Sequence, residues 1–173
     1  MGRERGSAVT DLPQYAAGLA IMLAMVCLTC FWHAEPRAQM LRSAAAIAAN
    51  WLAGVIYVHN TGNMTPWHFS ILIDTLAAFA VMYHPAGKVQ GFIGLFYCFQ
   101  IAGHIAFGAR QMLGLGADAI FYYDSITYVA WGQLVAMGVW CGGIWIADLV
   151  HRLRDSRHTH HVRTGHFADR KDL

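Results

Sequence analysis

Apolar residues fall along the chain in long runs separated by short polar segments. A run of about 20 apolar residues has the length that crosses the hydrocarbon core of a bilayer as an α-helix. The sequence has such runs in five places, and we predict helices at 13–33, 42–59, 66–84, 90–112 and 120–149. The pattern predicts an all-α protein, a polytopic bundle of transmembrane helices over residues 1–150, followed by a polar, His-rich tail over 151–173.

Two of these runs leave alternatives open. The run at 42–59 is rich in alanine and contains Asn50, so an arrangement with four spans is an alternative to five. The run at 13–33 follows basic residues, as the apolar part of a secretory signal does. It is longer than such a signal, and the bulky Trp32 stands where a cleavage site needs a small residue. We interpret it as a retained helix.

Composition agrees with a membrane protein. Hydrophobic residues make up 57% of the chain and charged residues 13%, against roughly 25% charged residues in soluble domains. No phosphate-binding loop, dinucleotide fingerprint, HExxH or GxSxG motif occurs, so no enzyme class is indicated. We expect a non-enzymatic protein without a cofactor. Its expected partners are the lipid bilayer and either further copies of itself or another membrane protein, and not nucleic acid.

The lysines and arginines are distributed unequally between the two sides of such a bundle. One side holds Arg37, Arg42, Lys88 and the basic residues of the tail, and the other holds Arg3, Arg5 and Arg110. Basic residues next to spans favour the cytoplasmic side. We therefore predict a multi-pass protein of the bacterial inner membrane with a cytoplasmic C-terminus.

Polar residues inside the predicted spans are the candidate site. Asp74 lies ten residues before His84, and Gln100 lies ten after Gln90, so both are about 15 Å from the same membrane side. His104 follows one turn deeper on the same face as Gln100. Counting residues also places Asn50 and Gln133 near the midplane. The sequence therefore predicts one intramembrane polar cluster of Asn50, Asp74, Gln100, His104 and Gln133.

Several functions are compatible with this cluster. A carboxylate in mid-membrane costs about 2.5–3.5 kcal/mol. Protonation, hydrogen bonds to Asn50, Gln100 or Gln133, and pairing with protonated His104 are the alternatives that offset this cost. We favour a hydrogen-bonded pair of Asp74 and His104, in which one proton can be shared. Such a pair is either a structural clamp that fixes helix register or part of a proton or ion pathway. A holin-like membrane-permeabilising protein of phage lysis is an alternative. A haem-binding redox subunit is another, although His68 and His84 lie on nearly opposite faces of one helix.

Small residues at helix-packing spacing give a further prediction. Gly87-x-x-x-Gly91 and Gly138-x-x-x-Gly142 have the spacing at which glycines let two membrane helices approach closely. We predict that these four glycines pack helices together, either within one chain or between the copies of an oligomer.

Cysteine and the tail histidines point to no specific metal site. All the cysteines fall inside predicted spans, which argues against a disulfide framework. Cys27 and Cys30 have the spacing of redox and metal motifs, but small apolar core thiols are the favoured interpretation. His158, His160 and His161 lack a cysteine or paired carboxylate that would complete a metal site. We interpret the tail as a solvated cytoplasmic segment.

Overall fold

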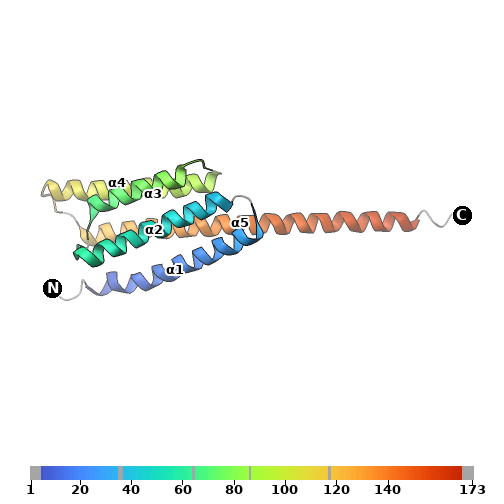
Figure 1. Ribbon diagram of the computed structural model, residues 1–173, viewed down its shortest axis with the longest axis horizontal. Coiled ribbons are helices and arrows are strands. Elements are labelled where there is room, and N and C mark those ends of the chain that lie inside the picture. Colours follow the sequence, from blue (N-terminus) through green and yellow to red (C-terminus); the bar gives the residue numbers. More distant parts are fainter. Residues whose placement is uncertain (1–4, 35–36, 64, 86, 117, 169–173) are drawn as a thin grey trace.

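The structure, a computed structural model, is helical throughout the part of the chain that it describes (Figure 1). It describes residues 5–34, 37–63, 65–85, 87–116 and 118–168, and the side chains among them from residue 13 to residue 154. The helices are α1 (Arg5–Trp32), α2 (Arg37–Thr61), α3 (Trp67–Met82), α4 (Lys88–Met112) and α5 (Ala119–Ala168). The prediction of an all-helical protein with helices in these five segments is confirmed.

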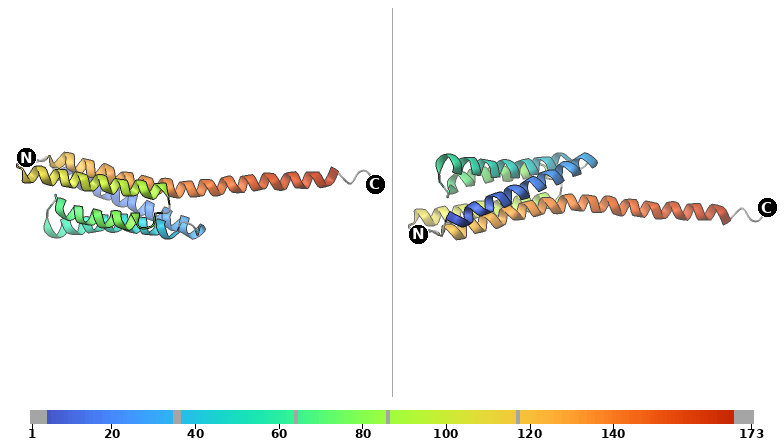
Figure 2. Two further views of the ribbon diagram at one scale, coloured as in Figure 1. Left: turned by 90° about the horizontal axis from the view of Figure 1, so that it is seen from above. Right: turned by 90° about the horizontal axis from the view of Figure 1, so that it is seen from below.

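The helices form one bundle in which neighbours along the chain are neighbours in space. Each helix packs against the next one, and α5 closes the ring by packing against α1. Consecutive helices run in opposite directions because the connections between them are short (Figures 1 and 2). The α1–α2 and α3–α4 connections therefore lie at one end of the bundle, and the α2–α3 and α4–α5 connections lie at the other.

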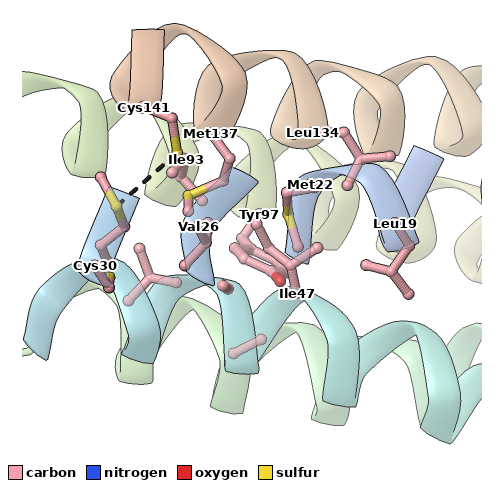
Figure 3. Packing of buried hydrophobic residues seen from close by; sticks show 14 of the residues in the cluster. Leu19, Met22, Val26, Cys30, Ile47, Ile93, Tyr97, Leu134, Met137 and Cys141 are labelled. Atoms are coloured by element: carbon pink, nitrogen blue, oxygen red, sulfur yellow. Dashed lines mark hydrogen bonds between the residues drawn. The ribbon is translucent and has the colours of Figure 1, made fainter. Parts of the chain in front are cut away.

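Most of the buried side chains in the interior of the bundle are apolar, and Figure 3 shows a cluster of them. Tyr97 is fully buried beside Met22 and Ile47, and Cys141 Sγ contacts Met40 Sδ at 3.9 Å. The remaining core is built mainly from Leu19, Val26, Val81, Ile93, Leu134 and Met137. Helices α1, α2, α4 and α5 all contribute large side chains to this core, so they pack around one shared apolar interior.

The outer faces of the helices are also apolar. Phe79, Phe99 and Val139 are among the large hydrophobic side chains that are more than half exposed. Helices α1, α2, α4 and α5 are long and apolar enough to cross a membrane, judged by length and composition alone. A helical bundle with this exterior is compatible with a membrane protein. The run at 42–59, which the sequence left in doubt, is one of these four helices.

Helix α3 is shorter than predicted. It has 16 residues, or about 24 Å, because its last turn ends at Met82 and Tyr83 is already extended. His84 precedes Pro85 and adopts a left-handed conformation with φ of 48°. A residue before proline is sterically disfavoured in the α-helical region, so the helix ends before His84 rather than at it.

Helix α5 is longer than predicted and continues into the tail. It contains 50 residues, or about 75 Å, so the helix does not end near residue 149. Its second half projects beyond the other helices (Figure 1). The predicted tail at 151–173 is thus helical as far as Ala168. The side chains of His158, His160 and His161 lie outside the described part of the structure.

The four glycines predicted to pack helices do not do so within one chain. A methyl group added at Gly87, Gly91, Gly138 or Gly142 would meet no other atom within 4 Å. Each of them thus has open space where a side chain would begin, and the sequence spacing alone does not reveal which helix face meets a neighbour. Packing of these glycines between copies of the chain stays a prediction.

Other glycines make the close approaches. A Cβ at Gly108 would lie 2.5 Å from the Trp67 ring on α3, and a Cβ at Gly132 would lie 2.8 Å from Phe96 on α4. A Cβ at Gly18 would lie 2.8 Å from Trp131 on α5. Each of these glycines therefore accommodates an aromatic ring of a neighbouring helix.

Two glycine-to-alanine variants test this assignment. We expect Gly108→Ala to lower the free energy of unfolding by about 1–3 kcal/mol, because the new methyl group overpacks the Trp67 ring. Gly142→Ala is the matched control, and we expect it to be neutral or stabilising by up to about 1 kcal/mol through higher helix propensity. Unfolding followed by tryptophan fluorescence in detergent measures both. Equal destabilisation by the two variants would contradict the assignment.

Candidate polar site inside the bundle

Asp74 is the centre of the polar site. It lies near the middle of α3, on the face that also buries Ala77 and Val81, and it is only 2% exposed. Asn50 on α2 donates a hydrogen bond from Nδ2 to Asp74 Oδ1 at 2.6 Å. A donor supplied by a neighbouring helix stabilises a carboxylate that water cannot reach. This bond joins α2 to α3.

His104 on α4 contacts the second oxygen of the same carboxylate. Its Nε2 atom lies 3.0 Å from Asp74 Oδ2. The ring N–H does not point straight at this oxygen, which otherwise has no hydrogen-bond partner among the described residues. The contact is therefore an electrostatic attraction and not an aligned hydrogen bond. This attraction is strongest when the imidazole is protonated. Both side chains are buried, so the pair is shielded from water.

Tyr122 on α5 completes the chain of contacts. Its hydroxyl lies 2.5 Å from His104 Nδ1, and its ring stacks on Phe107 with the ring centroids 4.0 Å apart. We name the four residues Asn50, Asp74, His104 and Tyr122 the Asp74 cluster. It draws one side chain from each of α2, α3, α4 and α5.

The Asp74 cluster can hold a proton in more than one position. When His104 carries its proton on Nε2, this N–H faces Asp74, and Nδ1 accepts a hydrogen bond from the Tyr122 hydroxyl. When the carboxyl group carries the proton, Nδ1–H of the imidazole donates to the Tyr122 oxygen instead. The second state holds one more proton than the first, so uptake of a proton by the Asp74 and His104 pair reverses the direction of the bond to Tyr122.

Gln100 and Gln133 form a second polar contact one helical turn from His104. Gln133 Nε2 on α5 donates to Gln100 Oε1 on α4 at 2.7 Å, and both side chains are buried. The structure thus places the five predicted residues in two groups. Asn50 and His104 each contact Asp74, whereas Gln100 and Gln133 contact each other.

Tyr97 is a further polar group in the interior. The residue is fully buried on α4, one turn before Gln100. Its hydroxyl has no hydrogen-bond partner among the residues that the structure describes. The inner face of α4 therefore carries polar groups at Tyr97, Gln100 and His104 in succession, and the sequence analysis had placed the last two on one face.

Three polar residues of the interior were not recognised from the sequence. Tyrosine is a residue type that is common at the interface between membrane and water. Tyr122 is instead buried, and it contacts His104. Gln90 on α4 is fully buried and donates to the Val81 carbonyl at 2.7 Å. Buried Thr29 on α1 accepts a hydrogen bond from Trp145 Nε1. The position of Tyr122 just after the α4–α5 turn, within side-chain reach of His104, was the available signal.

Metal or haem binding has little geometric support at this site. Both ring nitrogens of His104 face protein groups, so neither is directed at an iron atom. Among the described residues, no three histidine, cysteine, aspartate or glutamate side chains gather closely enough to hold a metal ion. Cys27 is exposed and Cys30 is buried, so these two thiols do not share an environment.

The chemistry that the site supports is hydrogen bonding and proton exchange among buried groups. Asp74 supplies a carboxylate, His104 an imidazole and Tyr122 a hydroxyl, each held by a different helix. No protein-family model matches the chain, and neither a curated protein nor a solved structure shows significant similarity to it.

Proposed function

We propose that the protein is a non-enzymatic, multi-pass integral membrane protein in which the Asp74 cluster holds four helices in register. The observation that carries this proposal is the unbroken series of contacts from α2 through α3 and α4 to α5. The role that follows is structural: a stable membrane scaffold that assembles with copies of itself or with another membrane protein. In this proposal α3 crosses the membrane together with the four longer helices.

The energetics of a bilayer support a clamp. Lipid tails are as apolar as the helix surfaces, so hydrophobic burial contributes little to helix association in a membrane. A carboxylate has no alternative partner in the hydrocarbon region, and separation of the helices would leave Asp74 unpaired at a cost of several kcal/mol. The contacts of Asp74 with Asn50 and His104 therefore favour one arrangement of α2, α3 and α4 over others.

A proton relay is the second candidate. It is favoured by the contact between His104 Nδ1 and the Tyr122 hydroxyl, which extends the Asp74 cluster toward the α4–α5 end of the bundle. Intramembrane carboxylates and imidazoles often mark proton paths. In the other direction the polar contacts are made by glutamine side chains, which hold no exchangeable charge at neutral pH. The clamp is therefore the first candidate.

The distribution of charge supports one orientation in a bacterial inner membrane. Arg37, Arg42 and Lys88 lie at the end where α5 leaves the bundle, and Arg152 and Arg154 follow on α5. The excess of basic residues at this end favours the cytoplasmic side. The proposal therefore places the C-terminus in the cytoplasm.

Substitutions of Asp74 separate the clamp from the relay. We expect Asp74→Asn to lower the free energy of unfolding by about 1 kcal/mol, since the amide still accepts from Asn50. Asp74→Ala leaves two buried partners unpaired, and we expect a loss of about 2–4 kcal/mol. Denaturation in detergent, followed by tryptophan fluorescence, measures both. Equal stability of Asp74→Ala and wild type would overturn the clamp.

Proton flux into proteoliposomes gives the second readout. In the clamp proposal, wild type and Asp74→Asn both leave the vesicles as proton-tight as protein-free vesicles. In the relay proposal, wild type carries a flux that Asp74→Asn abolishes while the fold persists. A proton flux that wild type carries and Asp74→Asn does not would make the proton relay the first candidate in place of the clamp.

Removal of one hydroxyl group tests the contribution of α5. We expect Tyr122→Phe to lower the free energy of unfolding by about 1 kcal/mol, because the ring keeps its packing on Phe107 while His104 loses its partner. Tyr123→Phe is the control at the next residue, and we expect it to change the stability by less than about 0.5 kcal/mol. The same denaturation experiment measures both variants, and a larger loss for Tyr123→Phe would contradict the role of Tyr122.

Fusion proteins test the orientation. We expect a green fluorescent protein attached after Leu173 to fluoresce in bacterial cells, and alkaline phosphatase attached at the same place to stay inactive, because the fusion point lies in the cytoplasm. An active phosphatase fusion would reverse the orientation. Extraction of membranes with alkaline carbonate is the accompanying test of insertion, and release of the protein by this treatment would contradict a membrane-spanning fold.

A further inference from the structure

Basic side chains form a belt around one end of the bundle. We define the basic belt as Arg37, Arg42, Lys88, Arg152 and Arg154, which lie at the start of α2, at the start of α4 and on α5 where it leaves the other helices. Asp148 is the acidic side chain near this belt among the described residues, and it pairs with Arg152 at 3.0 Å. The belt therefore carries a clear excess of positive charge.

Contacts between the helices show that these residues share one end. Arg42 near the start of α2 donates from a guanidinium nitrogen to the His84 carbonyl in the α3–α4 turn at 3.2 Å. Trp145 on α5 contacts Thr29 and His33 at the end of α1. The α1–α2 connection, the α3–α4 turn and the exit of α5 thus lie at the same level.

Arg42 is held in a fixed position with donors to spare. Its guanidinium carbon lies 5.7 Å from the centroid of the Tyr83 ring, and one nitrogen binds the His84 carbonyl. Its Nε atom is buried and has no hydrogen-bond partner among the described residues. A guanidinium group has five N–H donors and matches phosphate oxygens in pairs. Arg42 is therefore oriented by protein contacts that leave most of its donors unused.

The start of α4 adds to the positive potential at the end of the bundle where Arg42 lies. Lys88 is the first residue of α4, and Gly87 before it offers no side-chain cap to the free N–H groups of the first turn. No acidic residue lies in the first turn of α2 or α4. The positive ends of these two helix dipoles therefore face the same side as the basic belt.

The opposite end of the bundle differs in charge. Arg110 there donates to the Gly116 carbonyl at 3.0 Å and 3.2 Å, and Asp118 caps the start of α5. Asp124 follows on the first turns of α5. The described side chains at this end thus include one basic residue and two acidic ones. Among the described side chains, an excess of positive charge therefore lies at the end where α5 leaves the bundle.

We propose that the basic belt binds the headgroups of anionic phospholipids, with Arg42 and Lys88 forming the site that holds one phosphodiester group. This proposal rests on the membrane insertion proposed above, which places the belt at headgroup level on the cytoplasmic leaflet. A phosphodiester accepts hydrogen bonds from the spare donors of Arg42 and is attracted by Lys88 and the start of α4. The ring of Tyr83, which is exposed next to Arg42, suits the same interfacial level.

The apolar surroundings of the site favour a lipid over a free anion as its occupant. Exposed apolar side chains such as Leu41, Phe79 and Met82 adjoin the site on α2 and α3. Acyl chains attached to the same phosphate can cover these side chains, whereas inorganic phosphate cannot. Each basic residue near a membrane surface contributes about 1 kcal/mol of attraction to anionic lipid, which is about fivefold in affinity.

Lipid-dependent stabilisation of the full-length protein in detergent tests the proposal. We expect the unfolding temperature of wild type to rise when phosphatidylglycerol is added, and to rise much less with phosphatidylcholine or inorganic phosphate. In the double variant Arg42→Gln with Lys88→Gln, we expect the phosphatidylglycerol concentration for half of the effect to increase about 25-fold. Arg110→Gln is the matched control, because this arginine also donates to a loop carbonyl but at the opposite end.

The outcomes distinguish a lipid site from general charge attraction and from a free-anion site. The single variant Lys88→Gln, which changes an exposed residue, keeps the test valid if the double variant does not fold. For this variant we expect the phosphatidylglycerol concentration for half of the effect to increase about fivefold. An equal weakening by Arg110→Gln would overturn the proposal in favour of general charge attraction. Equal stabilisation by inorganic phosphate would overturn it in favour of a free-anion site. Release of the protein by alkaline carbonate would instead contradict the membrane-spanning fold itself.

Discussion

The buried carboxylate of Asp74 is the constraint on which the arrangement of the bundle depends. A carboxylate buried inside the bundle needs partners from neighbouring helices, because water does not reach it. Asn50 and His104 provide these contacts, and Tyr122 orients His104 in turn. Rotation of any of these four helices would break a contact at the Asp74 cluster. The apolar core alone sets no comparable restriction, because apolar side chains can repack in several ways.

Much of this arrangement was predictable from the sequence, because helical geometry converts residue counts into depth. Asp74 and His104 lie on segments joined by a short turn, so their levels could be compared directly, and the structure brings them into contact. Tyr122 was harder to recognise. Its Cα lies near the start of α5, and only the length and direction of its side chain bring the hydroxyl to His104. Counting residues along a helix gives the level of a Cα atom, but it does not show how far or in which direction the side chain extends.

The structure departs from the sequence-based expectations at helix faces and helix ends. The spacing of Gly138 and Gly142 is that of a packing motif, but which face of α5 meets α1 and α4 depends on the whole bundle, and neither glycine makes a close approach to another helix of the same chain. The end of α3 depends on the conformation of His84 before Pro85. The continuation of α5 past residue 149 was missed because loss of hydropathy marks the end of an apolar segment and not the end of a helix.

The unbroken course of α5 has a mechanical consequence. One continuous helix runs from the contact of Gln133 with Gln100 inside the bundle to Ala168 far outside it. Each residue advances a helix by about 100° and 1.5 Å, so the direction in which every position of the projecting half faces is set by contacts inside the bundle. Because α5 is one continuous helix, a small rotation of α5 about its axis inside the bundle would turn the projecting half by the same angle.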